Sequence, residues 1–199
     1  MAKRKRVEVR KPMTRTQLDD FFNSFNTKCI TGQRNQLFFK TLLNLGARCS
    51  EILNMRYEDI HIDDDGDYYY HLITSKSGRG DFLPMPTHIY EAIMELSKAY
   101  GSRRHGYVFR PVSKDKPLED RYMRKVSNEY GERANIPFTV KTHDFRRTFA
   151  YHLFKKNGGN IYEVSRMLRH SDIGVTTVYL AMFTDDKKRA VKDLFWLDL

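Results

Sequence analysis

The chain has 199 residues, of which 40% are hydrophobic, so it is long enough for one folded domain with an ordinary core and is not disordered at the scale of a domain. A net charge of +10 favours a polyanionic partner, because lysine and arginine side chains that neutralise phosphates release bound counterions. Cys29 and Cys49 lack zinc-ligand and disulfide-framework spacing, and neither a signal peptide nor an apolar run of ~20 residues is present, which favours a cytoplasmic protein that does not span a membrane.

The N-terminal part predicts a flexible arm and two helices. Residues 1–11 form a basic arm without periodicity, which we expect to be solvated and disordered in the free protein. Thr14 or Thr16 can cap a first helix, whose buried face has helical spacing and consists of Leu18, Phe21, Phe22 and Phe25. A second helix is predicted over residues 33–45, with Gly46 as its C-cap.

Arg48 lies in the turn between this helix and a short helix that Ser50 can cap. We expect the turn to be buried, and a buried arginine needs either a carboxylate partner, such as Glu51, or a bound phosphate. Spacing alone favours the salt bridge.

Residues 60–86 alternate in hydrophobicity and contain turn signals, which predicts a small antiparallel sheet. Asp65 and Gly66 form a hairpin turn in it, since Gly66 does not stand where a calcium-binding loop requires glycine. The next strand, residues 68–74, leads into a glycine-rich tip that contains Lys76. A lysine in such a tip is ordinarily a solvated charge, and the residue order excludes a Walker phosphate-binding loop.

The middle of the chain predicts two more helices. Residues 88–100 form an amphipathic helix, and a basic loop over residues 102–116 contains a short strand at 107–109. A helix over residues 118–134 is rich in arginine and lysine, and a face of this kind is either solvated or lies along phosphates. We therefore predict a mainly α fold with a small antiparallel β-sheet (α+β).

Residues 139–182 carry two histidines, several arginines and a tyrosine at spacings that suggest one site. Thr142 is placed to cap a helix over residues 143–156, which puts His143 and Arg146 three residues apart on one face. The free N–H groups and positive dipole of a helix start attract an anion and disfavour a protonated histidine. We interpret this helix start as a centre that handles phosphate.

The rest of this segment extends the same predicted centre. Asn160 can cap a second helix that reaches Leu168, and a polar turn with His170 follows. His170 precedes Tyr179 by nine residues. No carboxylate cluster with metal-ligand spacing accompanies these basic residues in the sequence, which argues against a two-metal nuclease.

Three stretches resemble the tyrosine recombinase (phage integrase) family: LGARCSEIL at residues 45–53, HDFR at 143–146 and LRHSDIGVTTVY at 168–179. The family pattern is an arginine before a Ser-Glu-hydrophobic helix, a lysine in a β-hairpin, His-x-x-Arg, a second histidine, and a nucleophilic tyrosine nine residues later. The resemblance covers the chain from about Lys11 to its end. It implies the fold of a tyrosine recombinase catalytic domain.

The resemblance also implies the roles of the matching residues. Arg48 and Arg146 would bind the non-bridging oxygens of a phosphodiester. Tyr179 would be the nucleophile, and His143 would accept its phenol proton. The product would be a 3′-phosphotyrosyl link, which a 5′-hydroxyl of another strand can reverse without ATP, cofactor or metal.

The remaining matches complete the implied site. His170 would hydrogen-bond the phosphate or hold the tyrosine, and Lys76, with Arg79 as the competing assignment, would protonate the departing 5′ oxygen. The sequence departs from the family at Arg169, where glycine is usual, and at Arg147, which replaces a frequent histidine.

The implied organisation is a basic arm at 1–11, a catalytic domain at 12–183 and a helix at 184–199, which packs either on its own core or on a neighbouring subunit. The implied partner is double-stranded DNA, with four protomers assembled on paired sites and a monomer or weak oligomer when free. We expect the protein in the cytoplasm, associated with the nucleoid when it is on DNA.

Most family members have an additional N-terminal core-binding domain. The chain is either an isolated catalytic domain or a naturally minimal recombinase similar in size to fimbrial phase-variation invertases, and Met1 with its basic run favours a natural start. The implied function is site-specific DNA recombination by integration, excision or inversion. A type IB topoisomerase and a catalytically inactive DNA-binding protein are the alternatives.

Overall fold

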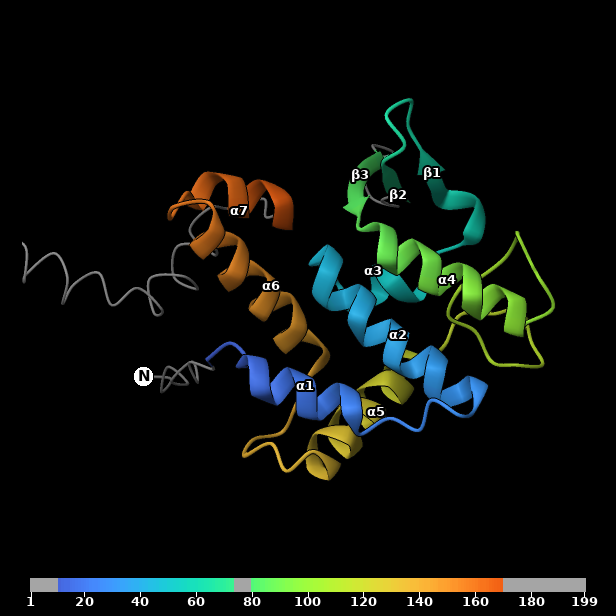
Figure 1. Cartoon of the computed structure of the whole chain (residues 1–199), viewed down its shortest axis with the longest axis horizontal. Coiled ribbons are helices and arrows are strands. Elements are labelled where there is room, and N and C mark those ends of the chain that lie inside the picture. Colours follow the sequence, from blue (N-terminus) through green and yellow to red (C-terminus); the bar gives the residue numbers. More distant parts are fainter. Residues whose placement is uncertain (1–10, 74–79, 170–199) are drawn as a thin grey trace, which may run out of the picture. The chain divides into compact units, whose positions relative to one another are not determined.

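The structure, a computed structural model, describes residues 11–73 and 80–169. The described chain divides into two compact units, one within residues 13–149 and the other containing residues 150–169. Figure 1 shows the helices of the described residues and a small antiparallel sheet in the first unit. The predicted fold class, mainly α with a small antiparallel β-sheet, is therefore confirmed.

The first helix begins, and the second helix ends, at a local capping signal. Helix α1 (Arg15–Asn23) starts at a capping box: Thr14 Oγ1 accepts from the backbone N–H of Gln17 at 3.2 Å, and Gln17 Oε1 accepts from that of Thr14 at 2.9 Å. Helix α2 (Ile30–Leu45) begins at residue 30, earlier than the predicted residue 33. It ends at the predicted C-cap, Gly46, whose φ of 59° is the left-handed conformation that favours glycine.

The sheet has the strand order β1-β2-β3, with β1 (Ile60–Ile62), β2 (Tyr68–Ile73) and β3 (Gly80–Met85) all antiparallel. A short 3-10 helix, η1 (Tyr57–Asp59), leads into it. The predicted turn between β1 and β2 is confirmed: Gly66 has a φ of 86°, and Asp63 Oδ1 accepts from the backbone N–H groups of residues 65 and 67. Lys76 and Arg79 lie outside the described residues.

Strand β3 leads directly into helix α4 (Thr87–Ala99), which packs against α2, and helix α5 (Asp120–Arg133) follows a long loop. The strand predicted at residues 107–109 is wrong. In the described chain this segment makes a single bridge, between Arg56 and Tyr107, instead of pairing along its length. Backbone bonds such as Val108 N–H to the carbonyl of Met55, at 3.0 Å, hold it against the segment before η1.

Aromatic side chains form the centre of the first unit's core. Phe21, Phe39 and Phe145 are fully buried, and the ring of Phe145 lies 5.1 Å from that of Phe21 and 5.0 Å from that of Phe39. Leu18 and Phe25 of the predicted face are also buried, whereas Phe22 is partly buried. Because Phe145 belongs to helix α6 (Thr142–Lys156), this core fixes the direction in which that helix starts.

The second unit contains helix α7 (Ile161–Leu168) after the end of α6. Asn160 is its N-cap as predicted, because the side-chain carbonyl accepts from the backbone N–H groups of Tyr162 and Glu163. Arg169 is its C-cap, with φ 54° and ψ 44°. No helix in residues 11–73 and 80–169 is long and apolar enough to cross a lipid bilayer.

Candidate active site

Arg48 is the N-cap residue of the short helix α3 (Cys49–Leu53), so the predicted cap at Ser50 is wrong. Arg48 has extended φ and ψ angles of −77° and 153°, and its backbone N–H donates to Glu51 Oε2 at 2.6 Å. The carboxylate in the first turn thus binds the N–H before the helix, as the acidic member of a capping box does. Glu51 therefore performs the capping function that was predicted for Ser50, and Ser50 lies inside the helix.

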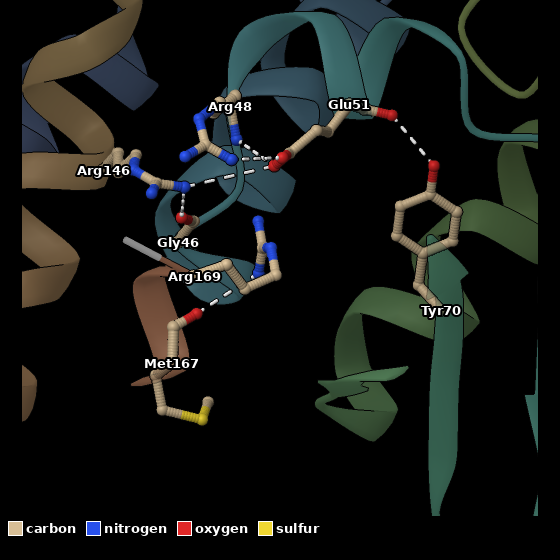
Figure 2. A network of polar contacts seen from close by, with 7 residues as sticks. All are labelled: Gly46, Arg48, Glu51, Tyr70, Arg146, Met167 and Arg169. Carbon is tan, nitrogen blue, oxygen red and sulfur yellow. Dashed lines mark hydrogen bonds and ion pairs between the residues drawn. The ribbon is translucent and has the colours of Figure 1, made fainter. Parts of the chain in front are cut away.

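Arg48 is also not buried, in contrast to the prediction from its turn. Ala47 packs into the core, and the side chain of Arg48 is 47% exposed. Its Nη1 donates to Glu51 Oε1 at 2.8 Å, so the carboxylate partner considered from the sequence is present (Figure 2). The pair holds the guanidinium at the surface, where solvent or a ligand can reach it.

Arg146 joins this group from helix α6, as Figure 2 shows. Its side chain is 2% exposed, and its Nη1 donates to the carbonyl of Gly46 at 2.8 Å and lies 4.0 Å from Glu51 Oε2. A side chain at position 46 would collide with the ring of Phe149, since a Cβ there would lie 2.2 Å from it. Glycine therefore allows the close approach of the α2 end to α6 that brings the carbonyl to Arg146.

Glu51 thus contacts both arginines. The sequence had indicated Glu51 only as a possible partner of Arg48. Its side chain is 11% exposed, and its backbone carbonyl accepts from the hydroxyl of Tyr70 on β2 at 2.9 Å. The contact with Arg48 could be predicted, because Glu51 follows Arg48 by three residues at the start of a helix. The second contact depends on α6 and has no local signal in the sequence.

The first turn of α6 is held by Asp144 and not by Thr142, which is the first residue of the helix instead of its predicted cap. Asp144 Oδ2 accepts from the backbone N–H of Lys141 at 2.8 Å, and Oδ1 accepts from Nη1 of Arg147 at 2.6 Å. His143 and Arg146 both project from this turn, as the predicted spacing requires.

His143 stands at the surface of this turn. Partial desolvation lowers the pKa of its imidazole below the ordinary value, and the positive charges of Arg147, Arg146 and Arg48 lower it further, whereas the carboxylate of Asp144 raises it. The direction agrees with the neutral histidine predicted from the sequence. A neutral imidazole beside two guanidinium groups can accept a proton while the arginines bind an anion.

Cys49 is the nucleophilic side chain next to Arg48 in the chain. Burial, followed by a hydrogen bond and charge repulsion from Asp120, raises the pKa of its thiol to about 12. The thiolate is the reactive form of cysteine, so this neutral thiol is a poor nucleophile at neutral pH.

Three of the six predicted site residues lie in the described chain. The structure brings Arg48 and Arg146 together at Glu51, and both arginines are close enough to His143 to lower the pKa of its imidazole. Lys76, His170 and Tyr179 fall outside the described residues.

Comparison with known proteins gives the chain its family. The model of the phage integrase family matches residues 11–185. A tyrosine recombinase of Pseudothermotoga lettingae is 27% identical over 192 residues, with 94% of this chain and 64% of that protein covered. Tyrosine recombinase XerA of Thermococcus onnurineus is 30% identical over 169 residues, with 80% of this chain and 55% of that protein covered.

A solved structure shares the fold. The XerH site-specific recombinase, in a post-cleavage complex with palindromic difH substrate, has a TM-score of 0.76 at 19% identity, with 92% of this chain and 53% of that chain covered. The present chain thus spans less than two thirds of the length of these relatives. Because the family model matches most of its residues, the chain belongs to the phage integrase family.

Proposed function

We propose that this chain is a site-specific DNA recombinase that cleaves and rejoins strands through a covalent 3′-phosphotyrosyl intermediate. The observation that carries the proposal is the convergence of Arg48 and Arg146, from distant parts of the sequence, on the carboxylate of Glu51 beside His143. The names of its relatives, which are tyrosine recombinases, support the same reaction.

The two arginines provide charge for a phosphodiester. Negative charge lies on the non-bridging oxygens during transfer, and guanidinium groups bind such oxygens with paired hydrogen bonds. Arg48 is exposed enough to reach a DNA phosphate, whereas Arg146 is fixed by the carbonyl of Gly46. Glu51 offsets the repulsion between the two cations and orients Arg48 before DNA binds.

The remaining roles concern proton transfer. The phenol oxygen of Tyr179 attacks phosphorus, its proton passes to His143, and the bond from phosphorus to the 5′ oxygen breaks. Lys76 protonates the departing 5′ oxygen, with Arg79 as the competing donor, and His170 hydrogen-bonds the phosphate. Attack by a 5′-hydroxyl on the phosphotyrosyl bond reverses these steps and joins a new pair of strands.

The assembly follows from the reaction. Exchange of two strands at each of two DNA sites requires four nucleophiles, so four protomers act on paired duplex sites in the cytoplasm. Within each protomer we assign residues 12–183 to catalysis, residues 1–11 to phosphate contacts and residues 184–199 to packing, on the same protomer or on its neighbour.

The decisive experiment traps the covalent intermediate. DNA that the protein binds specifically is first selected from a random pool. It is then nicked near each candidate cleavage position, so that a short fragment is lost after attack. The protein and the nicked DNA are incubated in the presence of EDTA, and the products are separated on a denaturing gel. We expect a protein–DNA adduct that disappears in Tyr179→Phe. Tyr162→Phe is the matched control, because Tyr162 is 76% exposed on α7 and has no proposed role. An adduct that persists in Tyr179→Phe, or no adduct on specifically bound DNA, contradicts the proposal.

A further inference from the structure

Asp144 is a buried carboxylate at the centre of the first turn of α6, and it is 2% exposed. Its two carboxylate oxygens bind the backbone N–H of Lys141 at 2.8 Å and Nη1 of Arg147 at 2.6 Å. Its backbone carbonyl accepts from the hydroxyl of Thr148 at 2.8 Å, and that hydroxyl accepts from the backbone N–H of Met13 at 3.0 Å. The residue therefore ties the start of α6 to the segment before it and to the start of the first unit.

These bonds restrict the residues on either side. Phe145 is anchored in the aromatic core, so the turn has little freedom to rotate. The side chain of Arg147 is 15% exposed and is drawn toward Asp144, which keeps its positive charge close to His143. A guanidinium that is partly buried and paired cannot move into solvent without leaving the carboxylate uncompensated.

Within residues 11–73 and 80–169, charged groups of two elements act on His143. On α6 these are the cations Arg147 and Arg146 and the anion Asp144, and at the start of α3 it is the cation Arg48. Glu51 faces the two arginines Arg48 and Arg146. Arg147 exerts the largest effect of the three cations, and Asp144 acts in the opposite direction. The adjacent ion pair thus places one charge of each sign beside the imidazole.

We propose that the Asp144–Arg147 ion pair is a positioning device for His143, which fixes the first turn of α6 and holds one charge of each sign next to the imidazole. Neither residue is assigned a contact with the reacting atoms. The importance of the pair for catalysis rests on the proposed function, whereas its effect on His143 is a property of the free protein.

The test is an NMR titration of the histidines of the full chain, with the His143 resonance assigned by its loss in His143→Gln. Asp144→Asn removes the negative charge but keeps a side-chain acceptor, so the protonation constant of His143 should fall by a factor of about three or more. Arg147→Gln removes the positive charge, so the constant should rise by a similar factor of about three or more. Arg147→Lys keeps the charge and should leave it nearly unchanged.

The control is Arg133→Gln, which removes an exposed arginine that is paired with Glu129 on α5. It should leave His143 unaffected. Shifts of the same sign in Asp144→Asn and Arg147→Gln, or no shift in either, overturn the inference. If Asp144→Asn does not fold, as judged by circular dichroism, the contrast between Arg147→Gln and Arg147→Lys decides it: a rise in the glutamine variant alone supports the device, and equal behaviour overturns it.

The pH dependence of cleavage separates this inference from the proposed function. A general base acts when it is neutral, so cleavage rises with pH through the pKa of His143. Arg147→Gln should move this rise to higher pH, and Asp144→Asn should move it to lower pH. If the NMR shifts occur and the rate profile does not follow them, the ion pair acts as inferred but His143 is not the base.

Discussion

Two pairs of arginines in the first unit have opposite surroundings. Arg48 and Arg146 share the carboxylate of Glu51, and the side chain of Arg48 is 47% exposed. Arg34 on α2 and Arg110 in the loop before α5 are only 4% and 3% exposed, and no carboxylate in the described part of the chain forms an ion pair with either. We call the first pair open because it has a carboxylate partner and its member Arg48 reaches the surface, whereas Arg146 is buried at 2% exposure. We call the second pair closed because both of its members are buried and neither has a carboxylate partner among the described residues.

Neutral oxygens hold the closed pair. Arg34 donates to Asn35 Oδ1 at 2.8 and 3.0 Å, to the carbonyl of Arg110 at 3.0 Å and to the hydroxyl of Tyr122 at 3.1 Å. The guanidinium of Arg110 lies over the ring of Tyr100, 4.5 Å from its centroid. Hydrogen bonds and cation–π contacts of this kind partly offset the cost of burying a charge.

The difference separates an arginine that is oriented at the surface from arginines that are buried in the fold. The hydrogen bonds of Arg34 all end on neutral protein oxygens, so this guanidinium is used for the fold. A guanidinium that is bound by a carboxylate near the surface is oriented and still reachable, as in Arg48. The total positive charge of the chain does not distinguish these two uses, but exposure and the type of partner do.

The largest effect should follow from the open pair. Arg48→Ala should lower the rate of adduct formation on nicked DNA by about 10² to 10³, the cost of removing one donor to a charged transition state. The melting temperature should change little, because a half-exposed ion pair contributes about 1 kcal/mol or less.

Arg56→Ala is the matched control for this variant, since Arg56 is 41% exposed and pairs with Glu58 at 2.7 Å. Single-turnover cleavage and thermal unfolding should be measured on both variants. Similar rates for Arg48→Ala and the wild type would place the phosphate elsewhere, and an equal loss in Arg56→Ala would reduce the effect to general charge.

Substitution in the closed pair should lower the stability of the protein and leave cleavage unchanged. Arg34→Leu leaves Asn35 Oδ1 without its donor and takes one of two donors from the hydroxyl of Tyr122, which keeps the bond from Asn35 Nδ2 at 3.0 Å. A buried polar group that loses its partner costs about 1–3 kcal/mol, and the cavity left by the shorter side chain adds to this loss. We expect a loss of about 2–4 kcal/mol in the free energy of unfolding in urea, with cleavage per folded molecule retained.

Arg15→Leu is the comparison for this loss, because the side chain of Arg15 is 88% exposed. It should change the free energy of unfolding by less than about 0.5 kcal/mol. If Arg34→Leu is equally mild, the buried arginine does not hold the fold together. If it instead removes cleavage from a stable protein, the contrast between the two pairs is incorrect.

Local signals explain what was predictable from the sequence. Thr14, Gly46 and Asn160 cap their helices as predicted, because a cap depends on residues within one turn of the chain. The HDFR spacing likewise placed His143 and Arg146 on one turn. These signals suffice for the fold class and for the two α6 members of the site.

Non-local contacts explain what was not predictable. Arg48 was expected in a buried turn, but Ala47 occupies the core and the arginine points outward. Glu51 meets Arg146 only because α6 returns to the end of α2. The partners of Arg34 at positions 110 and 122 are likewise remote in sequence, so no spacing rule links them.

Arg169 lies in a third kind of surroundings, and its substitution should change the stability of the protein least. It stands at the end of α7 with a φ of 54°, where the resemblance predicts glycine, and its Nη1 donates to the carbonyl of Met167 at 3.2 Å (Figure 2). The left-handed conformation costs a residue with a Cβ roughly 1–2 kcal/mol. Glycine removes this cost but loses more entropy on folding, by about 0.5–1 kcal/mol.

Arg169→Gly should therefore stabilise the protein by about 0.5–1 kcal/mol, measured as the free energy of unfolding in urea. Arg169→Ala keeps the strain of a Cβ at positive φ and removes only the side chain beyond it, so it should not stabilise. If both variants destabilise equally, the contacts of the Arg169 side chain outweigh the backbone strain, and this arginine belongs with the closed pair. If glycine stabilises and cleavage is retained, Arg169 serves neither the fold nor the phosphate.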